Sequence, residues 1–127
     1  MKTSHLDISP EKIAIYRQTA QRRRDQERAE ITRRKEQGWQ AARRAAHLLK
    51  EQFDATRVVV FGSLVHEGCF TRWSDVDIAA WGISSEDTFK AIGAVMDMDT
   101  DIEVNLVDIE SCHSSLLEVI TKEGIEV

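Results

Sequence analysis

The chain has 127 residues and a mass of 14.5 kDa, which is enough for one compact domain with one extended element but not for a second substrate-binding domain. Hydrophobic residues make up 42% of the chain, and no apolar run approaches the ~20 residues that a membrane helix requires. The first residues lack the apolar core of a signal peptide, and Cys69 and Cys112 are too few for a disulfide framework. We therefore expect a cytoplasmic protein with free thiols and no membrane association.

The net charge of −5 is divided unevenly along the chain. Residues 1–50 contain 13 lysines and arginines against 6 acidic residues, whereas residues 51–127 contain 4 against 16. Such asymmetry indicates that the basic part meets something acidic, which could be nucleic acid, a partner protein or the acidic half of another copy. A solvated helix without a partner explains the same pattern.

A long charged helix is predicted at the N-terminus. Ser9 can supply the N-cap, Pro10 suits the first helical position, and Glu11 suits the positive end of the helix dipole. Residues 18–37 are rich in helix formers but have almost no apolar stripe, so this part is expected to project or to pack on a partner. We assign residues 1–37 to a helical arm, which could mediate self-association, and 38–127 to the domain.

The domain shows alternating helix and strand patterns. Apolar residues spaced by three and four, from Trp39 to Phe53, predict a core-facing helix. The patterns further predict strands over 57–61, 75–81 and 102–108, a helix from Ser84 or Ser85 to about Met96, a last helix capped by Ser114, and a short strand over 125–127. Phe89 is expected to face the core, and Gly124 to adopt a left-handed conformation. The expected fold is α/β or α+β, with a small mixed sheet flanked by helices.

Two aspartates open the predicted strand DVDIAAW. Residues two apart in a strand point to the same face, about 6.5–7 Å apart, so Asp75 and Asp77 can converge on one small cation. Mg²⁺ prefers oxygen ligands and is typically shared between one or two carboxylates and substrate phosphates. Solvated aspartates in a turn are the ordinary alternative.

The turn after the strand VVVF carries Gly62 and Ser63. Glycine lets the backbone approach a ligand closely, and serine offers a hydroxyl and an N–H to phosphate oxygens. A helix starting at residues 64–67 would direct its positive end toward such phosphates. By itself, the Gly-Ser dipeptide is no more than a turn.

Together these residues, in VVVFGSLVHEGCFTRWSDVDIAAWG, resemble the minimal nucleotidyltransferases of the DNA polymerase β-like superfamily. That family places Gly-Ser after a strand and Asp-x-Asp on the next strand about ten residues later. The resemblance covers roughly residues 41–127 and implies the polymerase β-like nucleotidyltransferase fold. It also implies Mg²⁺ as cofactor and ATP as substrate, with Gly62 and Ser63 on the nucleotide and Asp75 and Asp77 on the metal.

The chain departs from the family pattern at three places. Eleven residues separate Ser63 from Asp75, and the turn has Leu64 and His66 where the family often has arginine. A third carboxylate is expected on a later strand, where the best match, Val104 to Ile109, has Asn105 at the corresponding position. Glu103, two residues earlier on the same strand face, is the candidate for the third catalytic and metal-binding carboxylate, and Asn105 is a candidate nucleotide contact.

The resemblance implies transfer of a nucleotide, AMP from ATP, to a hydroxyl on a protein partner. Many stand-alone members are antitoxins paired with a HEPN-type ribonuclease toxin, and that pairing is the partner expected here. The alternative is a non-catalytic module that keeps the fold and neutralises its partner by contact. Nucleic-acid binding ranks lowest, because acidic residues interrupt the basic arm and the body of the protein is acidic.

Overall fold

The computed structural model describes residues 9–127 as an α/β structure with one mixed sheet. In chain order the elements are α1 (Pro10–Gln52), β1 (Arg57–Phe61), the 3-10 turn η2 (Gly62–Val65), β2 (Val76–Trp81), α2 (Thr88–Met96), β3 (Val104–Val107), α3 (Ser114–Glu123) and β4 (Ile125–Glu126). The predicted order of helices and strands is confirmed, as is the mixed sheet flanked by helices. Within this described range, no helix is both long and apolar enough to span a bilayer.

The sheet has the strand order β3-β2-β1-β4. β1 runs antiparallel to β2 and to β4, whereas β2 and β3 are parallel and are connected through α2. In these registers Asp77 lies opposite Phe61 on one side and Asn105 on the other. The central strand β2 therefore brings its first residues between the end of β1 and the start of β3.

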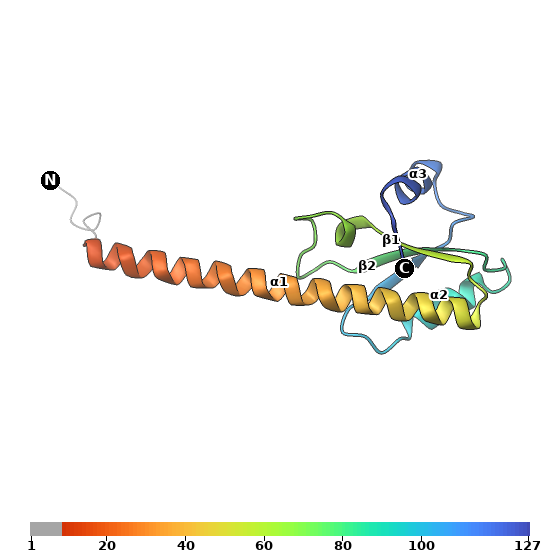
Figure 1. Ribbon diagram of the computed structural model, residues 1–127, viewed down its shortest axis with the longest axis horizontal. Helices are drawn as coiled ribbons and strands as arrows, with labels where there is room; N and C mark the ends of the chain where they lie inside the picture. The colour runs from red at the N-terminus through yellow and green to blue at the C-terminus, as the bar shows by residue number, and fades with distance from the viewer. Residues whose placement is uncertain (1–8) are drawn as a thin grey trace.

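The two faces of the sheet are covered by different helices (Figure 1). Alternate strand residues, including Val60 and Ile78, pack against the small side chains and Leu49 of α1 and against α2. The intervening residues, including Val59 and Ala79, pack against Ile120 of α3. Ile78, Leu49 and Ile120 are fully buried, and each such side chain contributes about 1.5–3 kcal/mol of hydrophobic stabilisation.

α1 is one uninterrupted helix that serves both the arm and the domain. The Ser9 hydroxyl accepts a hydrogen bond from the Lys12 N–H at 3.2 Å, which confirms the predicted N-cap. Burial begins at Gly38, where an added Cβ would approach Leu64 and Val76 to 3.3 Å, and the part before it extends away from the sheet (Figure 1). The helix thus passes through the position at which the arm and domain were divided.

The turn after β1 is 3-10 over Gly62–Val65, so an α-helix starting at residues 64–67 does not form. Three local predictions are wrong. Ser114 does not cap α3, because His113 is at the N-cap and Ser114 is the first helical residue. α2 starts at Thr88 instead of Ser84 or Ser85, and its buried residues are Ala91 and Val95, so Phe89 lies on the opposite side and is 81% exposed. Gly124 has φ −68° and ψ 150°, because the chain continues straight into β4 instead of turning back.

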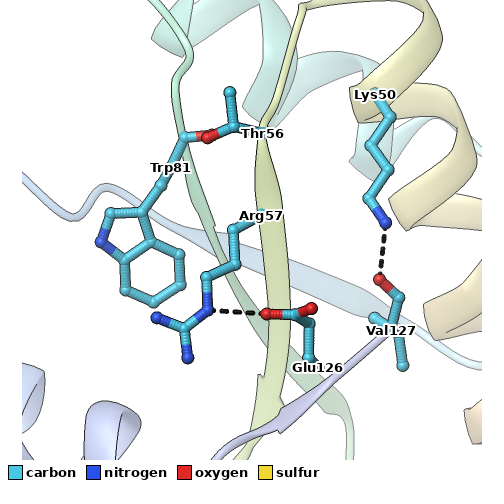
Figure 2. Close-up of polar contacts among 6 residues, drawn as sticks. All are labelled: Lys50, Thr56, Arg57, Trp81, Glu126 and Val127. Carbon is cyan, nitrogen blue, oxygen red and sulfur yellow. Dashed lines mark hydrogen bonds and ion pairs between the residues drawn. The ribbon is translucent and has the colours of Figure 1, made fainter.

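Side-chain contacts hold the last strand, β4, beside the first residue of β1 and beside α1 (Figure 2). Arg57 pairs with Trp81, at the opposite end of the strand pair from Asp77. Arg57 Nε donates to Glu126 Oε1 at 2.9 Å, and the Arg57 guanidinium lies 4.9 Å from the centre of the Trp81 ring. Lys50 Nζ donates to the main-chain oxygen of Val127 at 2.7 Å. These contacts hold β4 beside β1 and tie it to α1.

Candidate functional site

The turn after β1 approaches the aspartate pair closely. Gly62 has φ +80°, a left-handed conformation that side chains rarely adopt, and a Cβ built on it would lie 3.1 Å from Asp77 Oδ2. Ser63 follows in η2 and is half-buried. The structure thus brings Gly62 of the predicted Gly-Ser turn beside Asp77, although the turn is 3-10 and not the start of an α-helix.

Asp77 lies on the sheet face that α3 covers, and Asp75 immediately precedes β2. Strand alternation turns Val76 and Ile78 toward α1, where both are fully buried, and turns Asp77 the other way. Both aspartates are half-buried, and the charge of Asp75 acts on Asp77. The pair therefore forms a negative centre at the start of β2, open enough for a ligand to reach.

The electrostatic state of Asp77 is set by three neighbours. Burial raises the pKa of the Asp77 carboxyl above its ordinary 3.8, a hydrogen bond with the Asn105 side chain lowers it, and the negative charge of Asp75 raises it. The net direction is upward, because burial is the largest of these effects. A bound cation would relieve both the burial cost and the repulsion from Asp75.

Asn105 is the neighbour of Asp77 on the next strand, and Glu103 is not. The parallel register sets Asn105 opposite Asp77, whereas Glu103 is exposed and precedes β3, with its carbonyl oxygen accepting from the Val76 N–H at 2.9 Å. Among residues 9–127, no three His, Cys, Asp or Glu side chains gather as a metal-binding group. The oxygen donors brought together are thus two carboxylates and one amide, a set that fits Mg²⁺ shared with substrate phosphates.

One contact of the loop before Asp75 was not foreseen from the sequence. Arg34 of α1 donates from Nη2 to the carbonyl oxygen of Ser74 at 3.1 Å, and the Ser74 hydroxyl accepts from the Thr71 N–H at 2.9 Å. These bonds fix the residue immediately before Asp75 against the long helix. A separation of 40 residues between Arg34 and Ser74 leaves no periodic pattern from which the contact could be predicted.

A second link ties the end of the Gly-Ser turn to α3. His66 Nε2 lies 3.3 Å from Glu123 Oε2, so the turn and the helix above that face of the sheet are connected side chain to side chain. His66 stands where arginine is frequent in the family that the sequence resembles. In this protein the His66 side chain contacts the carboxylate of Glu123.

Comparisons with known proteins assign no family to the chain. No protein-family model matches the chain, and no curated protein matches it. The site is therefore defined by its own residues: Gly62, Ser63, Asp75, Asp77 and Asn105.

Proposed function

We propose that the protein is a Mg²⁺-dependent nucleotidyltransferase that transfers AMP from ATP to a hydroxyl on a protein partner. The observation that carries the proposal is the close approach of the Gly62 turn to Asp77, whose pKa is raised by burial and by Asp75. A phosphate chain on the turn and a cation on the aspartates would lie side by side. The polymerase β-like nucleotidyltransferase fold is part of the same proposal, supported by the mixed sheet and by the motif spacing.

In this proposal, some residues of the site bind phosphate or the cation, and one orients a metal-binding carboxylate. Gly62 leaves room beside Asp77 for phosphate oxygens, and Ser63 offers its hydroxyl and N–H to them. Asp75 and Asp77 hold the cation, and Asn105 keeps the Asp77 carboxylate oriented through its hydrogen bond. Bound Mg²⁺ supplies charge neutralisation at the phosphates and lowers the pKa of the acceptor hydroxyl.

The overall step is in-line displacement at the α-phosphorus of ATP. The acceptor oxygen forms the new P–O bond, the bond to the β-phosphate oxygen breaks, and pyrophosphate leaves with that electron pair. The acceptor proton passes to solvent or to a site carboxylate. The chain need only position the two reactants, because phosphoryl transfer requires little covalent chemistry from the protein.

A HEPN-type ribonuclease toxin is the proposed partner, and the protein is proposed as its antitoxin. The resemblance supports this pairing, and so does the exposed, charged helix α1, which offers a surface for contact with another protein. The reaction would then neutralise the toxin by modifying one of its hydroxyl groups.

The second candidate is a non-catalytic module that neutralises its partner by contact. It is favoured by one observation, the presence of Asn105 in place of a third carboxylate beside Asp77, with no three-residue acidic group in the described part of the chain. Both candidates keep the fold and the partner. They differ in whether label moves from ATP to that partner.

The deciding experiment follows transfer of label from α-labelled ATP to the partner protein with Mg²⁺ present or chelated. Asp75→Asn and Asp77→Asn are the site variants, and Asp101→Asn, an exposed acid outside the site, is the matched control. Mg²⁺-dependent labelling by wild type and D101N, lost in D75N and D77N, is expected. Partner binding and neutralisation without any labelling would favour the contact module.

A further inference from the structure

The core-facing side of α1 continues along the arm beyond the domain. The buried residues Gly38, Ala42, Ala45 and Leu49 follow one another in steps of three and four. Extended from Gly38 toward the N-terminus in the same steps, this line passes through Arg34 and then through a set that we call the seam: Ile13, Arg17, Ala20, Arg24, Glu27 and Ile31. Steps of three and four are typical of the contact line of a two-helix coiled coil.

Apart from the contacts that its last residues make with the loop before Asp75, the arm packs against nothing within the described chain. From Pro10 to Arg34 it spans about 37 Å and extends away from the sheet (Figure 1). Most of its residues are exposed. Ile13 is 37% exposed, and Tyr16, which lies beside it on the same side of the helix, is 73% exposed. Helices derive most of their stability from packing, so a projecting helix of this length favours a second helix alongside it.

We propose that the arms of two copies of this chain pair in antiparallel fashion along the seam. The pairing sets Ile13 against Ile31 of the partner subunit, Arg17 against Glu27 of the partner subunit, and Ala20 against Arg24 of the partner subunit. A two-fold axis repeats each contact, as a symmetric dimer requires. This proposal does not depend on the chemistry of Asp75 and Asp77.

Charge selects the antiparallel orientation. In a parallel pair each seam residue would face its own copy, so that Arg17, Arg24 and Glu27 would each meet a like charge. In the antiparallel pair the isoleucines meet each other and Arg17 meets a carboxylate. Opposite charges across such a seam specify partner and register.

The overlap also matches the free length of the arm. In this register the partner's Pro10 lies opposite Arg34, four residues before burial by the domain begins at Gly38. The partner's Ile13, facing Ile31, lies beside a recess of about 240 Å³ between α1 and the Thr71–Trp73 turn, whose lining includes Ile31 and Trp73. Trp73 is 79% exposed, so it offers apolar surface to an incoming side chain, among the charged lining residues Glu27, Glu30 and Arg72.

Disulfide trapping tests the register directly. Ile13 and Ile31 of one chain are about 27 Å apart along the helix, far beyond the roughly 7 Å limit for a disulfide. In a Cys69→Ser/Cys112→Ser background, I13C/I31C can therefore form the 13–31 bond only between chains. We expect a covalent dimer from the double variant under mild oxidation and none from I13C or I31C alone. Efficient linking of I13C to itself would show parallel pairing, and failure of the double variant to link would show that the seam is not paired; either result overturns the proposal.

Charge exchange tests the same pairing without cysteines. The solution mass of the wild-type chain, followed by light scattering through a dilution series, is expected to be twice 14.5 kDa at high concentration. Arg17→Glu and Glu27→Arg should each dissociate the dimer at least tenfold more readily, and the double exchange R17E/E27R should restore it. Arg22→Glu, on the opposite side of the helix, should leave it unchanged. A monomer at every concentration, or association that depends on nucleic acid removable by salt, would overturn the proposal.

Discussion

Asn105 lies opposite Asp77 on the neighbouring parallel strand, close enough for its side chain to act on the Asp77 carboxyl. The amide lowers the pKa of the Asp77 carboxyl, but burial and the charge of Asp75 raise it by more. The ionised form of Asp77 is therefore disfavoured in the folded protein. Without a bound metal, its negative charge is expected to lower the stability of the protein.

Asp77→Asn should stabilise the metal-free protein at neutral pH. A carboxyl whose pKa is raised in the folded state adds stability below its ordinary 3.8, and this is lost as pH rises through the folded pKa. Removing the charge should therefore raise the metal-free melting temperature, where about 1 kcal/mol corresponds to roughly 2–8 °C. The wild-type and variant temperatures should converge as pH falls toward 3.8. Melting curves in chelator over a pH series check this, with Asp101→Asn as control; a D77N protein that melts below wild type at every pH would contradict it.

Adding a divalent cation should raise the melting temperature of the wild-type protein above that of Asp77→Asn. Ligand that binds only the folded state stabilises it, by about 2.7 kcal/mol at a hundred times Kd. Mg²⁺ or Mn²⁺ should raise the melting temperature of wild type and leave D77N unchanged. Equal shifts in both proteins would place the cation outside the aspartate pair.

The third oxygen ligand can be identified by two single changes. Asn105→Asp sets a carboxylate beside Asp77, and we expect Mn²⁺ to bind roughly tenfold more tightly, equivalent to about 1.4 kcal/mol. Glu103→Gln should leave Mn²⁺ affinity near that of wild type, because Glu103 is exposed and joins no metal-binding group in residues 9–127. Titration by calorimetry measures both. Loss of Mn²⁺ binding in E103Q alone would assign the third position to Glu103.

Gly62→Ala should damage the site more than its backbone strain explains. Gly62 and Gly68 have nearly equal positive φ values, +80° and +79°, so alanine costs about 1–2 kcal/mol of conformational energy at either position. Only at Gly62 would the new Cβ meet Asp77 Oδ2, at 3.1 Å, since Gly68 faces open space. We expect similar melting temperatures for G62A and G68A but weaker Mg²⁺ and ATP binding for G62A alone. Equal binding by both variants would remove the Gly62 turn from the site.

The sequence predicts the elements whose patterns are local. The Ser9 cap, the apolar spacing of α1 after Gly38 and the β-branched run of β1 all depend on neighbours within a few residues. Strand alternation likewise predicts Asp75 and Asp77 on one face, although β2 begins only at Val76, between them. It was the family resemblance that joined the Gly-Ser turn and the aspartates into one candidate site.

Contacts between distant segments were not predictable in this way. Phe89 fits an apolar spacing of three and four with Ile92 and Met96, but the helix starts at Thr88 and its buried line runs through Ala91 and Val95. The Arg34 bond to Ser74 joins residues 40 positions apart and follows from how the loop crosses α1. Pairing of Asn105 with Asp77 depends on the parallel register of β2 and β3, which no local pattern specifies.

Gly124→Ala should destabilise the protein strongly. The reason is steric overlap of the added Cβ, and not the left-handed backbone that the position of Gly124 at a helix end predicts. Its backbone is extended, but a Cβ there would overlap Cγ1 of Val59 and the carbonyl oxygen of Ile120, both in rigid core elements. Overpacking of this kind costs about 1–3 kcal/mol, so the midpoint of urea unfolding should fall. Gly93→Ala is the matched control, because it lies inside α2 with nothing within 4 Å of its added Cβ. Alanine there should stabilise by about 0.5–1 kcal/mol through helix propensity. If G124A unfolds at the wild-type midpoint, the close approach of α3 to β1 is not the reason for glycine at this position.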